Sequence, residues 1–147
     1  MTATNHGLIG IVLGAYLPLP IAVPVALISH FILDALPHYG IAQNKRNTSV
    51  RYKRIVIIDT FIALSFAVLA ASQGKWSLFI VGWVAYSPDI MWVVSYFRHH
   101  KNLRIKITNP IMRFHKNIQR YERPWGAYVE LALLAVTLPI SLYNIFN

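Results

Sequence analysis

Between residues 29 and 40 the chain reads Ser29-His30-Phe31-Ile32-Leu33-Asp34-Ala35-Leu36-Pro37-His38-Tyr39-Gly40, which sets two histidines and a carboxylate in an otherwise apolar run. His30, Asp34 and His38 follow one another at intervals of four residues. On an α-helix this interval places side chains on one face, about 6 Å apart between Cβ atoms, so neighbours can share one cation. Pro37 disfavours helix at Leu36, so we expect the helix to end there and His38 to follow it. The same side chains could instead satisfy one another in a core without any metal.

The composition is that of a membrane protein. Hydrophobic residues make up 56% of the 147 residues and charged residues only 13%, which is too apolar for an ordinary soluble core. Residues 55–72, 76–97 and 125–146 are each long enough to cross a hydrocarbon layer about 30 Å thick as a helix. We therefore expect one integral-membrane domain, residues 1–147, with an all-α fold. These three stretches are its expected transmembrane helices.

Three prolines between positions 18 and 24 divide the first apolar stretch, residues 7–36, and are hard to place in one straight helix. We expect two helices, residues 6–17 and 21–36, joined as a hairpin that returns to the side of the membrane from which it started. The alternative is a single long tilted span, which would place the two ends of the stretch on opposite faces.

Positive charge is concentrated at two places. Of the 14 Lys and Arg, five lie in residues 45–54 and eight in residues 98–123, and the formal net charge is +9. Such clusters can bind nucleic acid, but here they flank apolar spans, where the positive-inside rule explains them. We therefore expect no nucleic-acid partner and a cytoplasmic location for both clusters. Residues 98–124 are expected to form an amphipathic segment along the membrane surface.

Four of the five acidic residues fall inside apolar segments, where an ionised side chain is costly without partners and usually faces a bundle interior. On each expected helix, small residues lie on the same face as the ionisable side chain, and small residues let membrane helices approach closely. We therefore expect these side chains to converge in the cytoplasmic half of the bundle: His6, His30, Asp34, His38, Asp59, Asp89 and Glu130. His115, in the surface segment, could cover them, whereas we expect His99 and His100 to be interfacial.

Mixed imidazole and carboxylate ligands suit zinc in the first place, and manganese or iron as alternatives. The chain has no cysteine, so thiolate ligands are excluded. The candidate ligands exceed what one tetrahedral ion needs, so we expect two or more divalent ions. Clustered divalent ions attack phosphate esters because they generate hydroxide and stabilise the attacking and leaving oxygens.

Two families resemble parts of this chain. Thr2-Ala3-Thr4-Asn5-His6 leading into a glycine-containing apolar helix, His30-x-x-x-Asp34, and Ser87-Pro88-Asp89 resemble the bacterial membrane-bound metal-dependent hydrolases, also described as LexA-binding, inner-membrane-associated hydrolases. That resemblance implies residence in the bacterial inner membrane and metal-dependent hydrolysis. More distantly, residues 30–38 are similar to the His-x-x-x-Asp segment, ending in Pro and His, of zinc-dependent phospholipase C and its related single-strand nucleases. Those enzymes are all-helical and cleave phosphodiesters at a clustered zinc site.

The leading hypothesis is a membrane-embedded, metal-dependent hydrolase of a phosphate ester, with a phospholipid or lipid-linked substrate reached from the cytoplasmic leaflet. The expected metal ligands are His6, His30, Asp34, Asp59 and Asp89. The expected catalytic residues, which would be further ligands or the general acid and base, are Asp34, His38, His115 and Glu130. Arg113, Lys116 and Arg120 could bind the phosphate of the substrate, or could serve only as topology charges.

The alternative hypothesis is a small transporter or proton relay, since buried carboxylates and histidines beside proline-broken helices also mark ion pathways. A transporter of this length would need to form an oligomer to enclose a path. A third hypothesis is haem binding through histidines of a helical bundle. The sequence leaves the oligomeric state, the substrate and the identity of the metal open.

Overall fold

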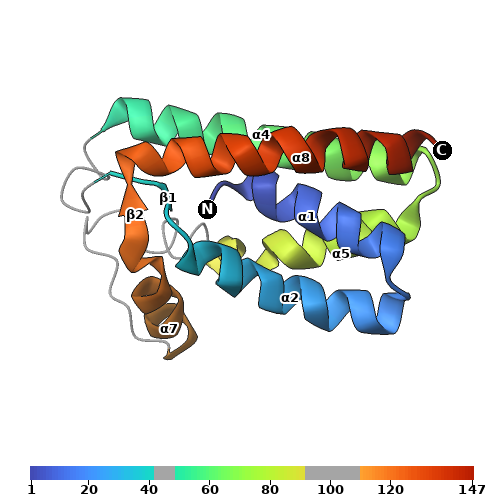
Figure 1. Ribbon diagram of the computed structural model, residues 1–147, viewed down its shortest axis with the longest axis horizontal. Coiled ribbons are helices and arrows are strands. Elements are labelled where there is room, and N and C mark those ends of the chain that lie inside the picture. Colours follow the sequence, from blue (N-terminus) through green and yellow to red (C-terminus); the bar gives the residue numbers. More distant parts are fainter. Residues whose placement is uncertain (42–48, 92–109) are drawn as a thin grey trace.

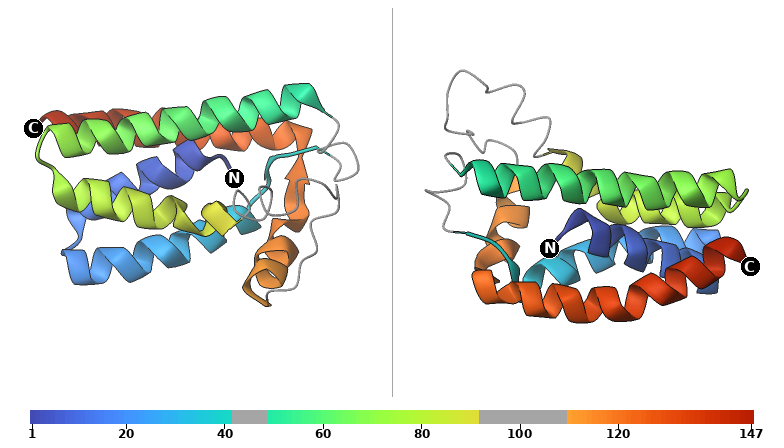
Figure 2. Two further views of the ribbon diagram at one scale, coloured as in Figure 1. Left: turned by 180° about the vertical axis from the view of Figure 1, so that it is seen from behind. Right: turned by 90° about the horizontal axis from the view of Figure 1, so that it is seen from above.

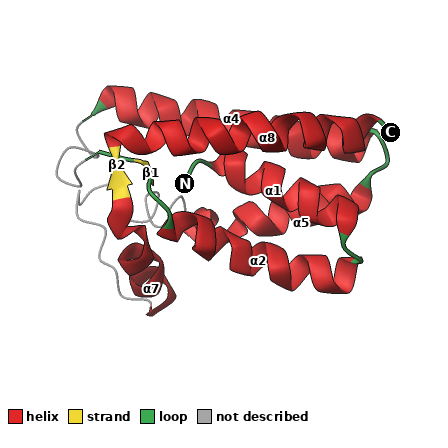
Figure 3. Ribbon diagram, viewed as in Figure 1, coloured by secondary structure: helices red, strands yellow, loops and turns green. Residues whose placement is uncertain are grey.

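The computed structural model describes residues 1–41, 49–91 and 110–147. These residues fold into a helical bundle, which confirms the expected all-α class (Figures 1 and 3). In chain order the helices are α1 (Ala3–Tyr16), α2 (Leu19–Ala35), α4 (Val50–Ser72), α5 (Trp76–Tyr86), α7 (Pro110–Ile118) and α8 (Ala127–Phe146). Helix α1 contacts α2, α4, α5 and α8 and is the central helix, as the two further views in Figure 2 show.

Helices α1 and α2 form the hairpin that the prolines predict, so the single long span is set aside. Pro18 precedes α2 with a backbone φ of −61°, and its missing N–H costs nothing at a helix start. The helix begins at Leu19, two residues earlier than expected, because Pro20 also lies in the first turn, where no N–H partner is required. Pro24 lies within α2 and does not end it.

Glycine lets α1 and α5 lie unusually close together. A Cβ atom added at Gly10 would approach the carbonyl oxygen of Val81 to 2.6 Å and Cα of Gly82 to 2.7 Å, so only glycine fits there. Small residues allow this close approach between apolar helices. The contact sets the position of α1, and therefore the height at which His6 enters the bundle.

Two helical segments are long and apolar enough to cross a membrane: α4, and residues 124–146, which include α8. Only 17% and 22%, respectively, of an 18-residue apolar stretch in each segment is buried. Large side chains such as Phe61 and Leu131 therefore point outward. The third expected span, residues 76–97, is not confirmed. Helix α5 ends at Tyr86 and a 3-10 turn, Ser87–Asp89, follows it. Pro88 has no N–H to continue the helix, and the Ser87 hydroxyl donates to the Val84 carbonyl instead. Residues 92–97 lie outside the described part of the chain.

The segment after residue 109 folds across one end of the bundle. Residues 98–109 of the expected amphipathic segment lie outside the described residues, whereas α7 is followed by the 3-10 turns Gln119–Tyr121 and Pro124–Gly126. Between these turns, strand β2 (Glu122–Arg123) pairs in parallel with β1 (His38–Tyr39), which directly follows α2. In Figure 1, α7 and both strands lie at one end of the bundle, with the N-terminus further in, and the α1–α2 turn, the α4–α5 turn and the C-terminus lie at the other end. The two-strand pairing therefore ties α7 to the end of α2.

Candidate metal centre

Four side chains from three segments meet at the end of the bundle that α7 covers. They are His30, Asp34, Asp89 and His115, and one ligand atom from each lies within 4.8 Å of the others. The last turns of α2 supply His30 and Asp34, the 3-10 turn after α5 supplies Asp89, and α7 supplies His115. The first pair is local, because residues four apart on a helix share a face. The other two residues join it only through the packing of distant segments.

Asp34 is the hub of this group, and its side chain is fully buried. Its Oδ2 atom lies 2.6 Å from His115 Nε2 and 3.4 Å from His30 Nε2. Its Oδ1 atom lies 3.2 Å from His6 Nε2 and also forms an ion pair with the amino group of Met1. A buried carboxylate is costly unless it is paired and hydrogen-bonded, and here both oxygens have partners.

The tautomer of His30 follows from its second nitrogen. Nδ1 lies 2.8 Å from the carbonyl oxygen of Ala85, so it carries a proton and donates it. The lone pair of a neutral ring is then on Nε2, which lies 3.1 Å from His115 Nε2 and 3.9 Å from Asp89 Oδ1. A carbonyl that orients a histidine in this way is the usual outer partner of a metal-binding imidazole.

These residues fit a divalent metal. The rings of His30 and His115 and the side chain of Asp34 are fully buried, and that of Asp89 is 20% exposed. Two imidazoles and two carboxylates suit zinc, manganese or iron, and two carboxylates balance the charge of one divalent ion. His6 stacks on His30 with ring centroids 4.0 Å apart, and its buried Nδ1 has no hydrogen-bond partner among the described residues. The same contacts also fit a set of buried ion pairs and hydrogen bonds.

Asp59 and Glu130 enter the bundle nearby but bind the backbone. Asp59 accepts hydrogen bonds from the N–H groups of Ala3, at 2.6 Å, and Thr4, at 3.1 Å. Glu130 Oε1 accepts from the N–H groups of Thr2, at 3.0 Å, and Tyr39, at 3.3 Å. The first N–H groups of a helix have no partner within it and attract carboxylates. The structure therefore brings neither residue into the four-ligand group.

His38 lies just beyond α2, as expected, and is buried, but it is outside the four-ligand group. Its Nδ1 donates to the carbonyl oxygen of Leu36 at 2.8 Å, and its Nε2 lies 3.6 Å from Glu122 Oε1. Burial, together with the positive charge of the N-terminal amino group, lowers the pKa of His38 and favours the neutral ring.

The expected phosphate-binding residues Arg113, Lys116 and Arg120 are exposed on the segment that carries His115. Arg120 places its guanidinium carbon 4.9 Å from the ring centroid of Tyr121. His99 and His100 lie outside the described residues.

Sequence reasoning missed Gln119. Its amide nitrogen lies 2.9 Å from Asp34 Oδ2 and 3.1 Å from His115 Nε2. The signal that could have found it is its spacing, four residues after His115, which places two polar side chains on one face of a helical segment.

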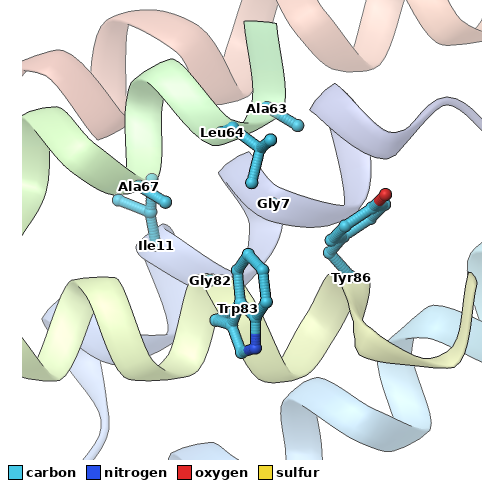
Figure 4. Close-up of a pocket in the computed structure, with 8 residues that line it drawn as sticks. All are labelled: Gly7, Ile11, Ala63, Leu64, Ala67, Gly82, Trp83 and Tyr86. Atoms are coloured by element: carbon cyan, nitrogen blue, oxygen red, sulfur yellow. The ribbon is translucent and has the colours of Figure 1, made fainter. Parts of the chain in front are cut away.

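An apolar pocket lies between α1, α4 and α5, and Figure 4 shows its lining. The residues are mostly small or aromatic: Gly7, Ile11, Ala63, Leu64, Ala67, Gly82, Trp83 and Tyr86. No histidine or carboxylate lines this pocket, so it offers no ligand for a metal ion.

Comparison with known protein families, with curated proteins and with solved structures finds no match to this chain. What the centre can do is therefore inferred from its geometry and chemistry.

Proposed function

We propose that this protein is a membrane-embedded hydrolase that uses a bound divalent metal to cleave a phosphate ester. The observation that carries the proposal is the buried group of His30, Asp34, Asp89 and His115. Two carboxylates and two imidazoles with converging ligand atoms are an expensive arrangement in an apolar bundle. A divalent cation offsets that cost.

The proposed metal is zinc, with manganese and iron as alternatives. A bound divalent ion supplies hydroxide at neutral pH and neutralises charge on a phosphate. His30 and Asp34, on α2, would bind the ion together with Asp89, on the 3-10 turn after α5, and His115, on α7. His6 reaches Asp34 through its other oxygen, so a second ion would lie on that side of Asp34.

Two residues outside the four-ligand group would handle protons. The lowered pKa of His38 favours the neutral ring, and its Nε2, 3.6 Å from Glu122 Oε1, has no hydrogen-bond partner among the described residues. It would therefore hold a proton that leaves the attacking water or enters the leaving group. Glu130 accepts an N–H from Tyr39, the neighbour of His38, and we propose that it positions this histidine. The distance from His38 to the substrate phosphate depends on the position in which the substrate binds.

The proposed substrate is a phospholipid or a lipid-linked phosphate. Support comes from the two long apolar helices and from the outward-facing side chains on them. Arg113, Lys116 and Arg120 are exposed on the segment that carries His115, so they would attract an anionic head group to the end of the bundle that holds the centre. The charge distribution and the family resemblance favour several spans in a bacterial inner membrane, with the centre on the cytoplasmic side.

Metal analysis of detergent-purified protein tests this function. The parent protein and an Asn117→Ala control, which removes an exposed amide from α7, should retain divalent metal and hydrolyse a phosphodiester lipid analogue. Asp34→Asn should do neither. A parent protein that folds but binds no divalent metal would exclude the hydrolase.

One observation favours a proton relay instead. His6, Asp34, His115 and His30 form a continuous chain of close polar contacts that ends at the carbonyl of Ala85. Such chains can pass protons within membranes. Proton flux into liposomes that contain the metal-free protein, abolished by Asp34→Asn, would favour this second function.

A further inference from the structure

Gln119 makes two contacts that hydrogen bonds alone do not satisfy. Its amide nitrogen lies 2.9 Å from Asp34 Oδ2 and 3.1 Å from His115 Nε2, and those two atoms are 2.6 Å apart. The three atoms therefore form a triangle in which every side has the length of a hydrogen bond.

The ion pair with the Met1 amino group keeps Asp34 ionised, and the hydrogens of this triangle then cannot serve all three sides. With Asp34 ionised, its contact with His115 requires a proton on His115 Nε2. That N–H then faces the amide NH₂ group of Gln119, donor to donor. Turning the amide by 180° brings its oxygen in and satisfies His115, but the oxygen then faces the carboxylate, acceptor to acceptor. Each arrangement leaves one close contact between like groups.

A cation at the centre of the group removes this conflict. His115 would then carry its proton on Nδ1 and offer the lone pair of Nε2, and the amide of Gln119 would turn its oxygen inward, so that every contact in the group would be made through the same ion. Ligands bound at 2.0–2.2 Å lie about 3 Å apart around an octahedral ion and about 3.4 Å apart around a tetrahedral ion. His115 lies 2.6 to 3.7 Å from Asp34, Gln119, His30 and Asp89. Asp34 lies 2.9 Å from Gln119 and 3.4 Å from His30, and His30 lies 3.9 Å from Asp89, so these contacts bracket those values.

We propose that Gln119 is a fifth ligand of the metal centre through its amide oxygen; this rests on the proposed metal-dependent function. The ligand set is then two nitrogens and three oxygens. Zinc is usually satisfied by four ligands, whereas manganese and iron take five or six and accept neutral oxygen donors. Gln119 therefore adds more to the affinity for manganese than to that for zinc.

The fold supports this role because Gln119 and His115 arrive together. They lie four residues apart on α7 and the turn after it, and β2 begins three residues beyond Gln119. The pairing of β2 with β1 holds this segment against the end of α2, where His30 and Asp34 lie. One short segment thus delivers two ligands to the pair on α2.

The test is a metal titration of detergent-purified, metal-stripped protein with Mn²⁺ and with Zn²⁺, each against a competing chelator. Gln119→Ala should lower the affinity for Mn²⁺ at least ~10-fold and that for Zn²⁺ less than ~3-fold. Asn117→Ala, two residues away, should change neither. In the Co²⁺-loaded protein, Gln119→Ala should make the visible absorption several-fold more intense, because four-coordinate Co²⁺ absorbs more strongly than five-coordinate Co²⁺.

Gln119→Glu keeps an oxygen at the same place and should retain Mn²⁺ binding, which supports the proposal even where Gln119→Ala does not fold. Unchanged Mn²⁺ affinity and an unchanged Co²⁺ spectrum in a folded Gln119→Ala protein would overturn the fifth ligand and leave the metal centre standing. Equal losses for both metals would also overturn the proposed preference. If the parent protein binds neither metal, it is the proposed function that fails.

Discussion

Two groups of carboxylates lie side by side in this bundle and have opposite kinds of partner. Asp34 contacts three imidazoles, the amide of Gln119 and the amino group of Met1, whereas Asp59 and Glu130 accept hydrogen bonds from backbone N–H groups. An imidazole can give up its proton and offer a lone pair to a cation. A backbone N–H cannot. The same residue type therefore forms a candidate ion site in one region and a helix cap in the other.

The largest effect expected is that of Asp34→Asn on bound metal. The amide keeps the size of the side chain but loses the charge that faces three imidazoles and would hold a cation. We expect divalent metal in the purified protein to fall more than ~100-fold, beyond the 10–100-fold typical of residues that only support a ligand. Elemental analysis after gel filtration measures this. If the variant retained the parent's metal content, the metal would bind elsewhere, and Asp34 would not differ from Asp59 and Glu130 in holding an ion.

Gly126→Ala should show whether the tie between β1 and β2 matters to the ion site. A Cβ atom at this position would overlap the backbone of His38, so the two segments must separate. We expect a loss of about 1–3 kcal/mol in stability and weaker metal binding, because His115 and Gln119 move with the segment.

Gly7→Ala is the matched control for this change, because a Cβ at Gly7 meets no atom within 4 Å. It should stabilise α1 by about 0.5–1 kcal/mol. Thermal melts and metal titrations of both variants provide the readout. Equal behaviour of the two glycine variants would show that the tie to β1 is not needed.

Asp59→Asn should show that the carboxylates bound to backbone N–H groups affect stability and not metal binding. Asparagine offers one acceptor oxygen in place of two, so the N–H groups of Ala3 and Thr4 compete for it. We expect a loss of about 1–2 kcal/mol in stability with the metal content unchanged. Denaturation in detergent and elemental analysis test this together. Loss of metal without loss of stability would return Asp59 to the ligand set expected from the sequence.

The smallest effect is expected for the exposed basic residues on the segment that carries His115. Replacing Arg113, Lys116 and Arg120 together by glutamine should weaken binding of a phosphodiester lipid analogue a few-fold and leave the metal content unchanged, since all three residues are exposed and salt screens their attraction for an anionic head group. The control removes equal charge from the start of α4, with glutamine at positions 51, 53 and 54. Equal weakening in both triple variants would mean that these residues act only as topology charges.

The sequence alone was sufficient for the local features. Proline spacing predicted the α1–α2 hairpin, and the residues of α4 and α8 predicted long apolar helices. The interval between His30 and Asp34 predicted that they share a face. These features depend on residues close together in the chain, whose geometry is set by backbone sterics and helix periodicity.

Only the tertiary structure decided which polar groups meet. The close approach at Gly10 positions α1 against α5, and the start of α1 then presents its N–H groups to Asp59, which the sequence had grouped with the metal ligands. The pairing of β1 with β2 brings Gln119 to Asp34 across 85 residues of chain. Such contacts depend on the positions of whole helices to within an ångström or two. Those positions come from the packing of many side chains at once, so neither residue type nor spacing can specify them.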